Sequence, residues 1–313
     1  MRIAIIDLGT NTFNLLVVEV NTDKSCTTLY QTKIPVKLGE GGINKDFIAE
    51  APFQRGIEAL KTYKSTIKEY KADKIYAVAT SAIRGASNGH EFVVKAREEA
   101  GIDVRVISGE QEAETIYYGV RKAVNISDQN SLIIDIGGGS TEFIIANNEK
   151  IVWKQSFLLG VARLLELFEP SDPINEAEIQ TLKDYLRLQL QPLSEALKRY
   201  PVTELIGSSG SFDSIAEMVA YKYYSPNILE GKTEFTFNLE HYRAIHQMIL
   251  KSTLEERTHM KGLVAMRVDM IVVSIILVDF ILTSYNISQM RLSTYSLKEG
   301  ILFEILHSLE EVA

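Results

Sequence analysis

The stretch LIIDIGGGSTEFII, residues 132–145, decides the fold of this chain. An apolar run ends in Asp135, three glycines and two hydroxyl side chains follow, and a second apolar run begins at Phe143. This order predicts a strand, a tight turn and a second strand. Successive N–H groups in such a turn form a nest for anions, and a carboxylate at its mouth can hold a divalent cation beside phosphate oxygens. A glycine-rich hairpin with a capping aspartate is the simpler alternative.

A second stretch with the same order of residue types, IIDLGTNTFNLLV, occupies residues 5–17. Four pairs of matched residues align without a gap: Asp7 with Asp135, Gly9 with Gly137, Thr12 with Ser140 and Asn14 with Glu142. Two copies in 313 residues predict two homologous halves, each of which contributes an aspartate and a turn to a shared cleft. A chance similarity between two hairpins is the alternative.

Four ordered motifs resemble those of the exopolyphosphatase and guanosine pentaphosphate phosphatase family, in the actin, sugar-kinase and Hsp70 superfamily. They are DLGTNT at 7–12, ATSAIR at 79–84, ISGEQEA at 107–113 and DIGGGSTE at 135–142. The resemblance extends from the first residue to beyond Gly300. It implies an α/β fold with two duplicated ribonuclease H-like (actin-like ATPase) domains around a central cleft. The expected domains are residues 1–124 and 125–296, with a final helix near 297–313 folded back on the first.

The resemblance also implies roles for individual residues. Glu112 is expected to be the general base, and Asp135, Glu142 and Asp7 are expected to bind Mg²⁺ or Mn²⁺. The expected phosphate-binding residues are Gly9, Thr10, Asn11, Thr12, Arg84, Gly137, Gly138, Gly139, Ser140, Thr141, Gly207, Ser208, Ser209, Gly210 and Ser211. Without the resemblance, Arg84 is as well explained by a surface ion pair, and residues 207–211 by a plain strand-to-helix turn.

The position of Glu112 follows from local sequence. Ser108 and Gln111 have the spacing of a capping box, with Ser108 as the N-cap and Gln111 at the third helical position. Glu112 therefore falls in the first turn of a helix, near the predicted cleft. Acidic side chains are favoured there by the helix dipole alone, so a structural role at the start of the helix is the alternative.

Composition narrows the classes of function. The chain is 46% apolar and 24% charged, as is usual for a soluble globular enzyme, and its single cysteine, Cys26, excludes an internal disulfide framework. A formal net charge of −8 argues against a general nucleic-acid binder, because phosphate contacts need a basic surface. A phosphate substrate must therefore be attracted by a local field of loops, basic side chains and metal.

The longest apolar stretch, Met270–Leu282, is interrupted by Ser274 and Asp279. It is too short to span a bilayer and predicts a buried core element. A strand begins almost at the first residue, which leaves no room for an export signal. We expect a cytoplasmic protein without a membrane or nucleic-acid partner, and a homodimer stays open.

Periodicity predicts most of the other elements. Strands are expected in 3–20 and at 26–39, 75–80, 104–107, 131–136, 141–146, 150–157 and 204–207. Helices are expected at 51–70, 88–101, from 108, 159–168 and 175–199, the last one kinked or divided at Pro192. The final helix is expected to bury one apolar face: Leu297, Ile301, Leu302, Ile305 and Leu309.

Three functions stay open. The first is a phosphohydrolase that removes the terminal phosphate of inorganic polyphosphate or of the 5′ end of guanosine pentaphosphate. The second is a phosphotransferase, as in sugar and acetate kinases, although the sequence shows no clear adenosine motif. The third is a non-catalytic nucleotide-binding regulator, against which the joint presence of Asp7, Glu112, Asp135 and Glu142 argues.

Several residues depart from the family pattern. Tyr295 is bulky where a small residue is common, and Lys298 replaces a guanidinium with a point charge. Near the strand-to-helix turn at 207–211, which is the third predicted phosphate-binding turn, the family pattern is also not matched by Ser211, Phe212 and Asp213. Because the chain is acidic and has no dense run of Lys and Arg, we expect short polyphosphates or guanosine pentaphosphate to be hydrolysed at least as efficiently as long chains.

Overall fold

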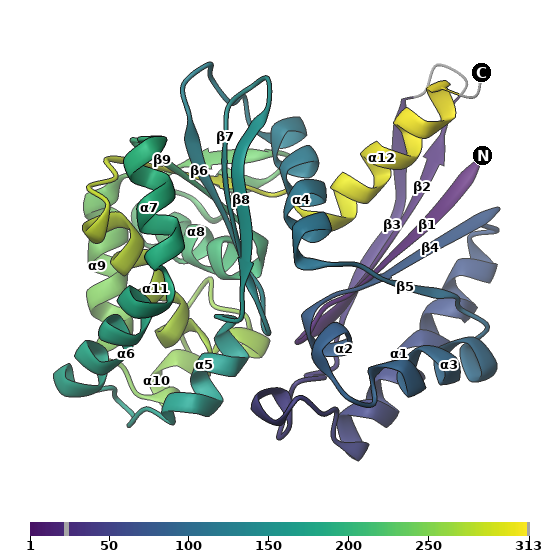
Figure 1. Cartoon of the computed structure of the whole chain (residues 1–313), viewed down its shortest axis with the longest axis horizontal. Coiled ribbons are helices and arrows are strands. Elements are labelled where there is room, and N and C mark those ends of the chain that lie inside the picture. The colour runs from purple at the N-terminus through teal and green to yellow at the C-terminus, as the bar shows by residue number, and fades with distance from the viewer. Residues whose placement is uncertain (22–24, 312–313) are drawn as a thin grey trace.

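The two apolar runs at the N-terminus pair into an antiparallel hairpin, and the first sheet is built around it (Figure 1). In this computed structural model, residues 1–21 and 25–311 are described, the side chains of 309–311 excepted. The strand order is β3-β2-β1-β4-β5, with β4 and β5 parallel to β1. The strands are β1 (Arg2–Leu8), β2 (Thr12–Val20), β3 (Cys26–Pro35), β4 (Lys74–Ala79) and β5 (Val104–Val106).

The second sheet repeats this order as β8-β7-β6-β9-β11 and adds β10 at its edge. Again the first hairpin is antiparallel, and the next two strands run parallel to its first strand. The strands are β6 (Ser131–Ile136), β7 (Thr141–Ala146), β8 (Ile151–Phe157), β9 (Glu204–Ser208), β10 (Glu234–Thr236) and β11 (Gln289–Ser293). The repeated order confirms the predicted α/β fold of two duplicated ribonuclease H-like domains.

Helices flank both sheets. In the first half they are η1 (Ile43–Lys45), α1 (Glu50–Glu69), α2 (Ser81–Gly85), α3 (Gly89–Ala100) and α4 (Gly109–Ala123). In the second half they are α5 (Val161–Phe168), α6 (Glu176–Gln189), α7 (Gln191–Arg199), α8 (Ser209–Tyr223), η2 (Pro226–Leu229), α9 (Leu239–Leu250), α10 (Leu254–Thr258), η3 (Ala265–Arg267), α11 (Ile271–Ser284) and α12 (Leu297–Glu311).

Three apolar clusters hold these layers together. One lies between the first sheet and α1 and α3, and another surrounds α11 in the second half. The third lies between the two sheets and contains apolar side chains of α4 and α12, which stand next to each other there (Figure 1). Helix α12 also contacts β1. The boundary between residues 124 and 125 stays a prediction.

Several local expectations are confirmed. The capping box of Ser108 and Gln111 is formed at the start of α4. The predicted helix over 175–199 is divided, and Pro192 lies in the first turn of α7, where its missing N–H leaves no bond unmade. Helix α11, which covers most of the longest apolar stretch, is buried along most of its length. In the last helix Leu297, Ile301 and Ile305 are buried and Leu302 is half-buried, whereas the side chain of Leu309 lies outside the described part.

Other expectations need correction. Strand β3 ends at Pro35 rather than at residue 39, because proline has no N–H to continue the ladder. Strands β10 and β11 were not expected, since both are short and β11 carries Gln289 and Arg291 between its apolar residues. Among the described residues, every helix is too short or too polar to cross a membrane.

Candidate active site

The two predicted turns lie at equivalent places in the two sheets. In the first, the N–H of Gly9 donates to the carbonyl of Thr12 (3.2 Å); in the second, the N–H of Gly137 donates to the carbonyl of Ser140 (3.0 Å). Each hydrogen bond closes a short turn between two antiparallel strands. Gly9 and Gly137 thus occupy the same place in the two turns, and successive N–H groups in such a turn can form a nest for an anion.

The turns approach each other closely. A Cβ atom on Gly138 would lie 2.6 Å from the side chain of Asn11, and one on Gly139 would lie 2.7 Å from that of Thr10. Because real Cβ atoms do not come so close to other heavy atoms, a side chain at either position would force Asn11 or Thr10 to move. The two halves therefore meet turn to turn, and a cavity of about 140 Å³ lies at their junction.

Most of the predicted site residues line this cavity, and they come from both halves. The predicted residues in the lining are Asp7, Gly9, Thr10, Asn11, Thr12, Glu112, Asp135, Gly137, Gly138, Gly139, Ser140, Ser209 and Gly210. The predicted residues outside the lining are Arg84, Thr141, Glu142, Gly207, Ser208 and Ser211. The structure thus brings three turns and three of the four predicted carboxylates to one place; their roles stay predictions.

Glu112 is buried in the cavity wall, in the first turn of α4. Its Oε2 accepts a hydrogen bond from Nη1 of Arg84 (2.8 Å), and the same nitrogen donates to the carbonyl of Ile107. Burial raises the pKa of Glu112 to about 7, against the lowering effect of Arg84 and with the repulsion of Asp135 and Asp7. Arg84, expected to contact phosphate, is thus engaged in orienting Glu112.

Asp135 accepts hydrogen bonds from three hydroxyl groups. Ser208 and Ser296 donate to its Oδ2 (2.7 and 2.5 Å), and Ser209 donates to its Oδ1 (2.7 Å). Ser209 adopts a left-handed backbone with φ of 72°, which is costly for a residue with a side chain and typical of ligand-binding sites. The turn at 207–211 therefore holds the carboxylate of Asp135 in place through the hydroxyl groups of Ser208 and Ser209.

Glu142 lies opposite Asp135 on the neighbouring strand and is almost fully buried. Its Oε1 accepts a hydrogen bond from Ser156 (2.7 Å). Burial, together with the charges of Glu112 and Asp135, raises the pKa of Glu142 well above its usual value. Thr141 donates to the carbonyl of Leu159 and, like Glu142, is not part of the cavity lining.

Asp7 is a carboxylate of the site that is only partly satisfied. Its Oδ2 accepts a hydrogen bond from Asn14 (2.9 Å), whereas its Oδ1 is buried without a hydrogen-bond partner among the described residues. Burial raises the pKa of Asp7 to about 7, although the Asn14 hydrogen bond and Lys298 oppose the shift. A buried acceptor without a donor is costly unless a ligand or water completes it, so this oxygen marks a binding position.

The basic side chains of the lining are Lys33, Arg267 and Lys298, none of which is among the predicted site residues. Arg267 lies against Gly210, where a side chain of any size would collide with its guanidinium. Lys298 forms an ion pair with Glu299 (2.8 Å). Burial alone would lower the pKa of Lys298, but Glu299, Asp7 and Asp213 raise it. Lysine 298 therefore stays protonated within the cleft.

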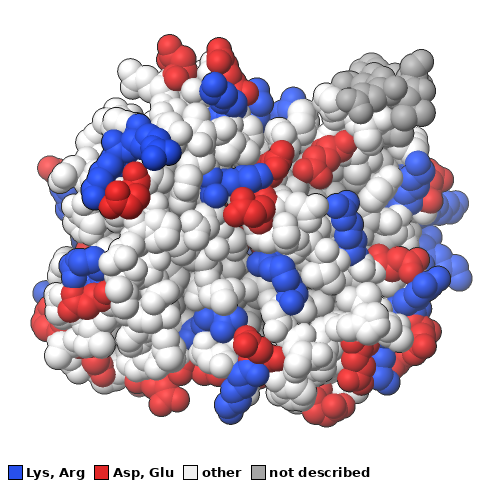
Figure 2. Space-filling model, viewed as in Figure 1, with Lys and Arg blue, Asp and Glu red and all other residues white. Residues whose placement is uncertain are grey.

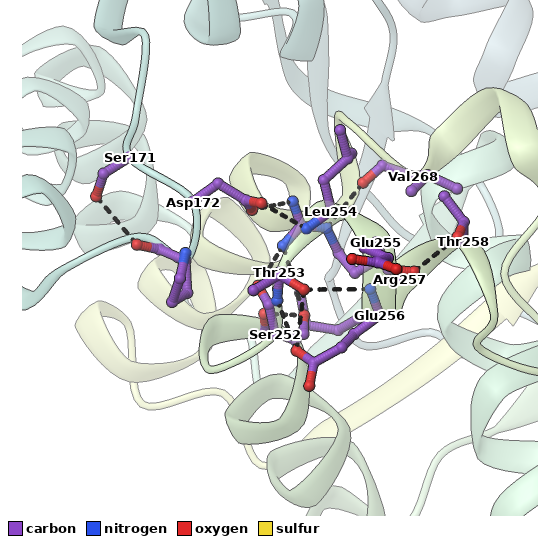
Figure 3. Close-up of polar contacts among 12 residues, drawn as sticks. Ser171, Asp172, Ser252, Thr253, Leu254, Glu255, Glu256, Arg257, Thr258 and Val268 are labelled. Atoms are coloured by element: carbon purple, nitrogen blue, oxygen red, sulfur yellow. Dashed lines mark hydrogen bonds and ion pairs between the residues drawn. The ribbon is translucent and has the colours of Figure 1, made fainter.

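A buried arginine, Arg257, bonds to Asp172, Ser252 and Val268 (Figure 3). Arg257 donates from Nη2 to Asp172 Oδ1 (2.7 Å), from Nε to the carbonyl of Val268 (3.0 Å) and from Nη1 to the carbonyl of Ser252. Because Val268 directly follows Arg267, this network holds the segment from which Arg267 reaches the cavity. Asp172 is 85 residues away from Arg257 in the sequence, so no local pattern indicated this network.

On the side shown in Figure 2, the surface of the described residues has no continuous basic patch that would offset the negative net charge of the chain. There, among the described residues, Lys and Arg side chains are interspersed with Asp and Glu rather than forming a continuous track. Near the cleft, Lys37 is also paired, with Asp269 (3.0 Å). On this side of the molecule, attraction of a polyanion therefore depends on the few cations in the cavity and on whatever binds with the substrate.

Two ribonuclease H-like domains with apposed glycine turns define a protein of the actin-like ATPase superfamily. A model of the Ppx/GppA phosphatase family matches residues 16–309, and the chain belongs to that family. An exopolyphosphatase from Cytophaga hutchinsonii is 39% identical over 98% of each chain, with a TM-score of 0.95. A Ppx/GppA family member from Aquifex aeolicus is 27% identical over 98% of each chain, with a TM-score of 0.79. The resemblance seen in the motifs is thus confirmed.

Proposed function

We propose that the chain is a phosphohydrolase that releases the terminal phosphate of inorganic polyphosphate, with the 5′-terminal phosphate of guanosine pentaphosphate as a second substrate. Membership of the family and the likeness to an exopolyphosphatase support this activity. The observation that carries it is the place of Glu112, a buried carboxylate between two phosphate-type turns.

Glu112 is suited to activating water. A general base works best when its pKa lies near the operating pH, and burial raises the pKa of Glu112 to about 7. Arg84 fixes the carboxylate in one orientation through Oε2, which leaves Oε1 for a water molecule. In the proposed step the water oxygen attacks the terminal phosphorus, its proton moves to Glu112, and the bridging P–O bond breaks with the electron pair on the shortened chain.

The turns around 9–12 and 137–140 are proposed to hold the oxygens of the transferred phosphate. Both turns line the cavity, and the glycines at 138 and 139 leave room there for a ligand to approach the backbone. Donors fixed in place by the fold stabilise charge in the transition state without reorganisation. Lys298 and Arg267 are proposed to bind the following phosphates, because both line the same cavity.

A divalent cation fits the donor set, provided that the substrate supplies further oxygen ligands. Carboxylate oxygens are the ligands that Mg²⁺ and Mn²⁺ prefer, and Asp7 Oδ1 is buried without a partner among the described residues. Within residues 1–21 and 25–311, however, no three acidic, His or Cys side chains converge as a ready-made metal cage. We therefore propose that Asp7 and Asp135, with Glu142 behind them, hold the ion only together with substrate oxygens. When bound, the ion would neutralise negative charge on the phosphates.

The test is the release of phosphate from tripolyphosphate, long-chain polyphosphate and guanosine pentaphosphate without any acceptor, with and without chelator. We expect release from at least one of the three, and loss of activity in chelator. Phosphate transfer that requires an added nucleoside diphosphate or sugar would make the chain a phosphotransferase instead. Binding without any turnover would favour the regulator.

A further inference from the structure

Asp213 stands in the cavity lining but has no part in the proposed reaction. It belongs to helix α8, whose first residues form the third turn. Ser209 and Gly210 also line the cavity, so the helix presents residues 209, 210 and 213 to the cleft. Helical spacing places Glu217 on the same side, one turn further along.

The opposite side of α8 is anchored in the core, which fixes the direction of Asp213. Phe212 is fully buried against Gly207, where a Cβ would lie 2.1 Å from its ring. Ser211 forms a hydrogen bond with Ser274 (3.0 Å), and Ile215 is also fully buried. The helix cannot rotate without losing these contacts, so Asp213 is held toward the cleft.

Three cations of the cleft lie near enough to Asp213 to act on its carboxylate. Lys298, Lys33 and Arg267 each interact with it electrostatically, and Arg267 is brought near by its packing on Gly210. Among the described residues, however, no basic nitrogen lies within the 4 Å of an ion pair with Asp213, and no hydrogen bond to its carboxylate is formed. Burial raises the pKa of Asp213 to about 6, so the carboxylate is mostly ionised at neutral pH.

This carboxylate changes the charge balance of the cavity. The lining holds three basic side chains, Lys33, Arg267 and Lys298, against the four acids Asp7, Glu112, Asp135 and Asp213. Three of these acids belong to the proposed reaction centre, whereas Asp213 faces the cations that would bind the rest of the chain. Further along α8, Glu217 also interacts with Lys33, so a second carboxylate continues the acidic side of the helix.

We propose that Asp213 is a specificity-determining residue that limits the length of phosphate chain the cleft accepts, by offsetting the positive charge of Lys298, Arg267 and Lys33. This inference rests on the proposed function. A terminal phosphate at the turns gains from the nearby donors, but each further phosphate passes an acidic side chain. Short chains and compact substrates therefore bind at little disadvantage to long ones.

The test compares Asp213→Asn with the unaltered protein, using kcat/KM per chain end on tripolyphosphate and on long-chain polyphosphate. We expect the long-to-short ratio to rise roughly tenfold, within the range that one unit charge exerts near a protein surface. The gain should appear mainly in KM. The dependence of log(kcat/KM) on log salt should steepen by about 0.7 for each additional phosphate that is neutralised.

Two further variants sharpen the test. Asp213→Glu keeps the charge and should keep the original ratio, whereas Glu230→Gln removes an exposed acid outside the cavity and should change nothing. An Asp213→Asn ratio within twofold of the original, or an equal change with Glu230→Gln, would overturn the role of Asp213.

Binding separates this inference from the proposed function. Calorimetric titration of tripolyphosphate and long-chain polyphosphate into Glu112→Gln protein, with and without Asp213→Asn, measures affinity in the absence of turnover. A gain in long-chain affinity without hydrolysis by the unaltered protein would overturn the proposed function alone. Hydrolysis with an unchanged ratio would overturn the role of Asp213 alone, and neither hydrolysis nor binding would overturn both.

Discussion

The first hairpin, β1–β2, and the second, β6–β7, have the same backbone but different chemistry. In both, an aspartate pairs across the strands with the residue two positions after the turn: Asp7 with Asn14, and Asp135 with Glu142. Asn14 donates a hydrogen bond to Asp7, whereas Glu142 places a second carboxylate beside Asp135. The duplicated scaffold is therefore conserved in shape, while the charge it carries is not.

The helices that follow the last parallel strands extend the comparison. Helix α4 follows β5 and α12 follows β11, at the same topological place. At the third helical position, Gln111 accepts from the N–H of Ser108, and Glu299 accepts from the N–H of Ser296. The next residue is Glu112 in α4 but Gly300 in α12.

This difference divides the work between the halves. Gly300 packs against α4, where a Cβ would lie 1.9 Å from the carbonyl of Thr115. Helix α4 thus supplies the proposed base, Glu112. At the equivalent position α12 has Gly300, which lets α12 pack closely against α4. Ser296, at the start of α12, donates instead to Asp135. A symmetric fold becomes an asymmetric site through single residues at equivalent positions.

The largest effect is expected where this asymmetry is strongest. Glu112→Gln should lower turnover by roughly 10²–10⁴, because a positioned general base contributes about that much. The fold should persist, since glutamine is nearly isosteric and the capping box uses Ser108 and Gln111. Glu110→Gln, in the same helical turn but exposed, is the matched control and should leave turnover unchanged. Near-normal turnover of Glu112→Gln would exclude the proposed mechanism.

Sequence reasoning reached Glu112 and both hairpins because local signals place them. The capping box fixes the start of α4, and each glycine turn is formed by residues that are adjacent along the chain. Ser296 and Lys298 could not be placed in this way, since the hydrogen bond of Ser296 to Asp135 and the electrostatic interaction of Lys298 with Asp7 join segments more than 100 residues apart. Arg84 shows the same limit: its partner, Glu112, is 28 residues away.

The second effect separates the two aspartates. Asp135→Asn should destabilise the protein by about 1–3 kcal/mol, because the amide offers one acceptor oxygen to Ser208, Ser209 and Ser296, which all donate to the carboxylate now. Asp7→Asn keeps its single acceptor for Asn14 and should cost much less. Both variants should lose activity. Denaturant unfolding at pH 7.5 measures the difference.

Equal losses of stability in the two variants would contradict this contrast. So would full activity of Asp135→Asn in the presence of chelator, which would also remove the metal from the proposed function. Asp128→Asn, at a position exposed before the second sheet, controls for the change in charge and should have little effect on stability.

The third effect concerns the helix pair. Gly300→Ala should destabilise the protein by about 1–3 kcal/mol, because the new methyl group collides with the backbone at Thr115 and forces α4 and α12 apart. Since Glu112 lies in the same helix as Thr115, turnover should fall as well. Gly85→Ala is the control, because a Cβ there meets nothing within 4 Å. An unchanged unfolding free energy for Gly300→Ala would show that the helix contact is loose.

The smallest expected effect is a change in the free energy of unfolding with pH, caused by Asp7 in the first hairpin. Burial raises the pKa of Asp7 to about 7 from an ordinary value of 3.8. Between these values the folded protein keeps a proton that the unfolded chain has released. Stability from this source is therefore complete below about pH 4 and is lost as the pH rises through 7. Glu112, raised to about 7 from 4.5, acts in the same direction.

Without substrate or metal, the melting temperature should therefore fall between pH 5 and pH 8, and Asp7→Asn should reduce that fall. A contribution of about 1 kcal/mol corresponds to roughly 2–4 °C for domains of this size. Thermal unfolding of both proteins across this pH range measures it, with Glu230→Gln as the exposed control. If Asp7→Asn falls as steeply as the unaltered protein, the buried oxygen of Asp7 already has a partner such as ordered water. The two hairpins would then differ less than their cross-strand residues indicate.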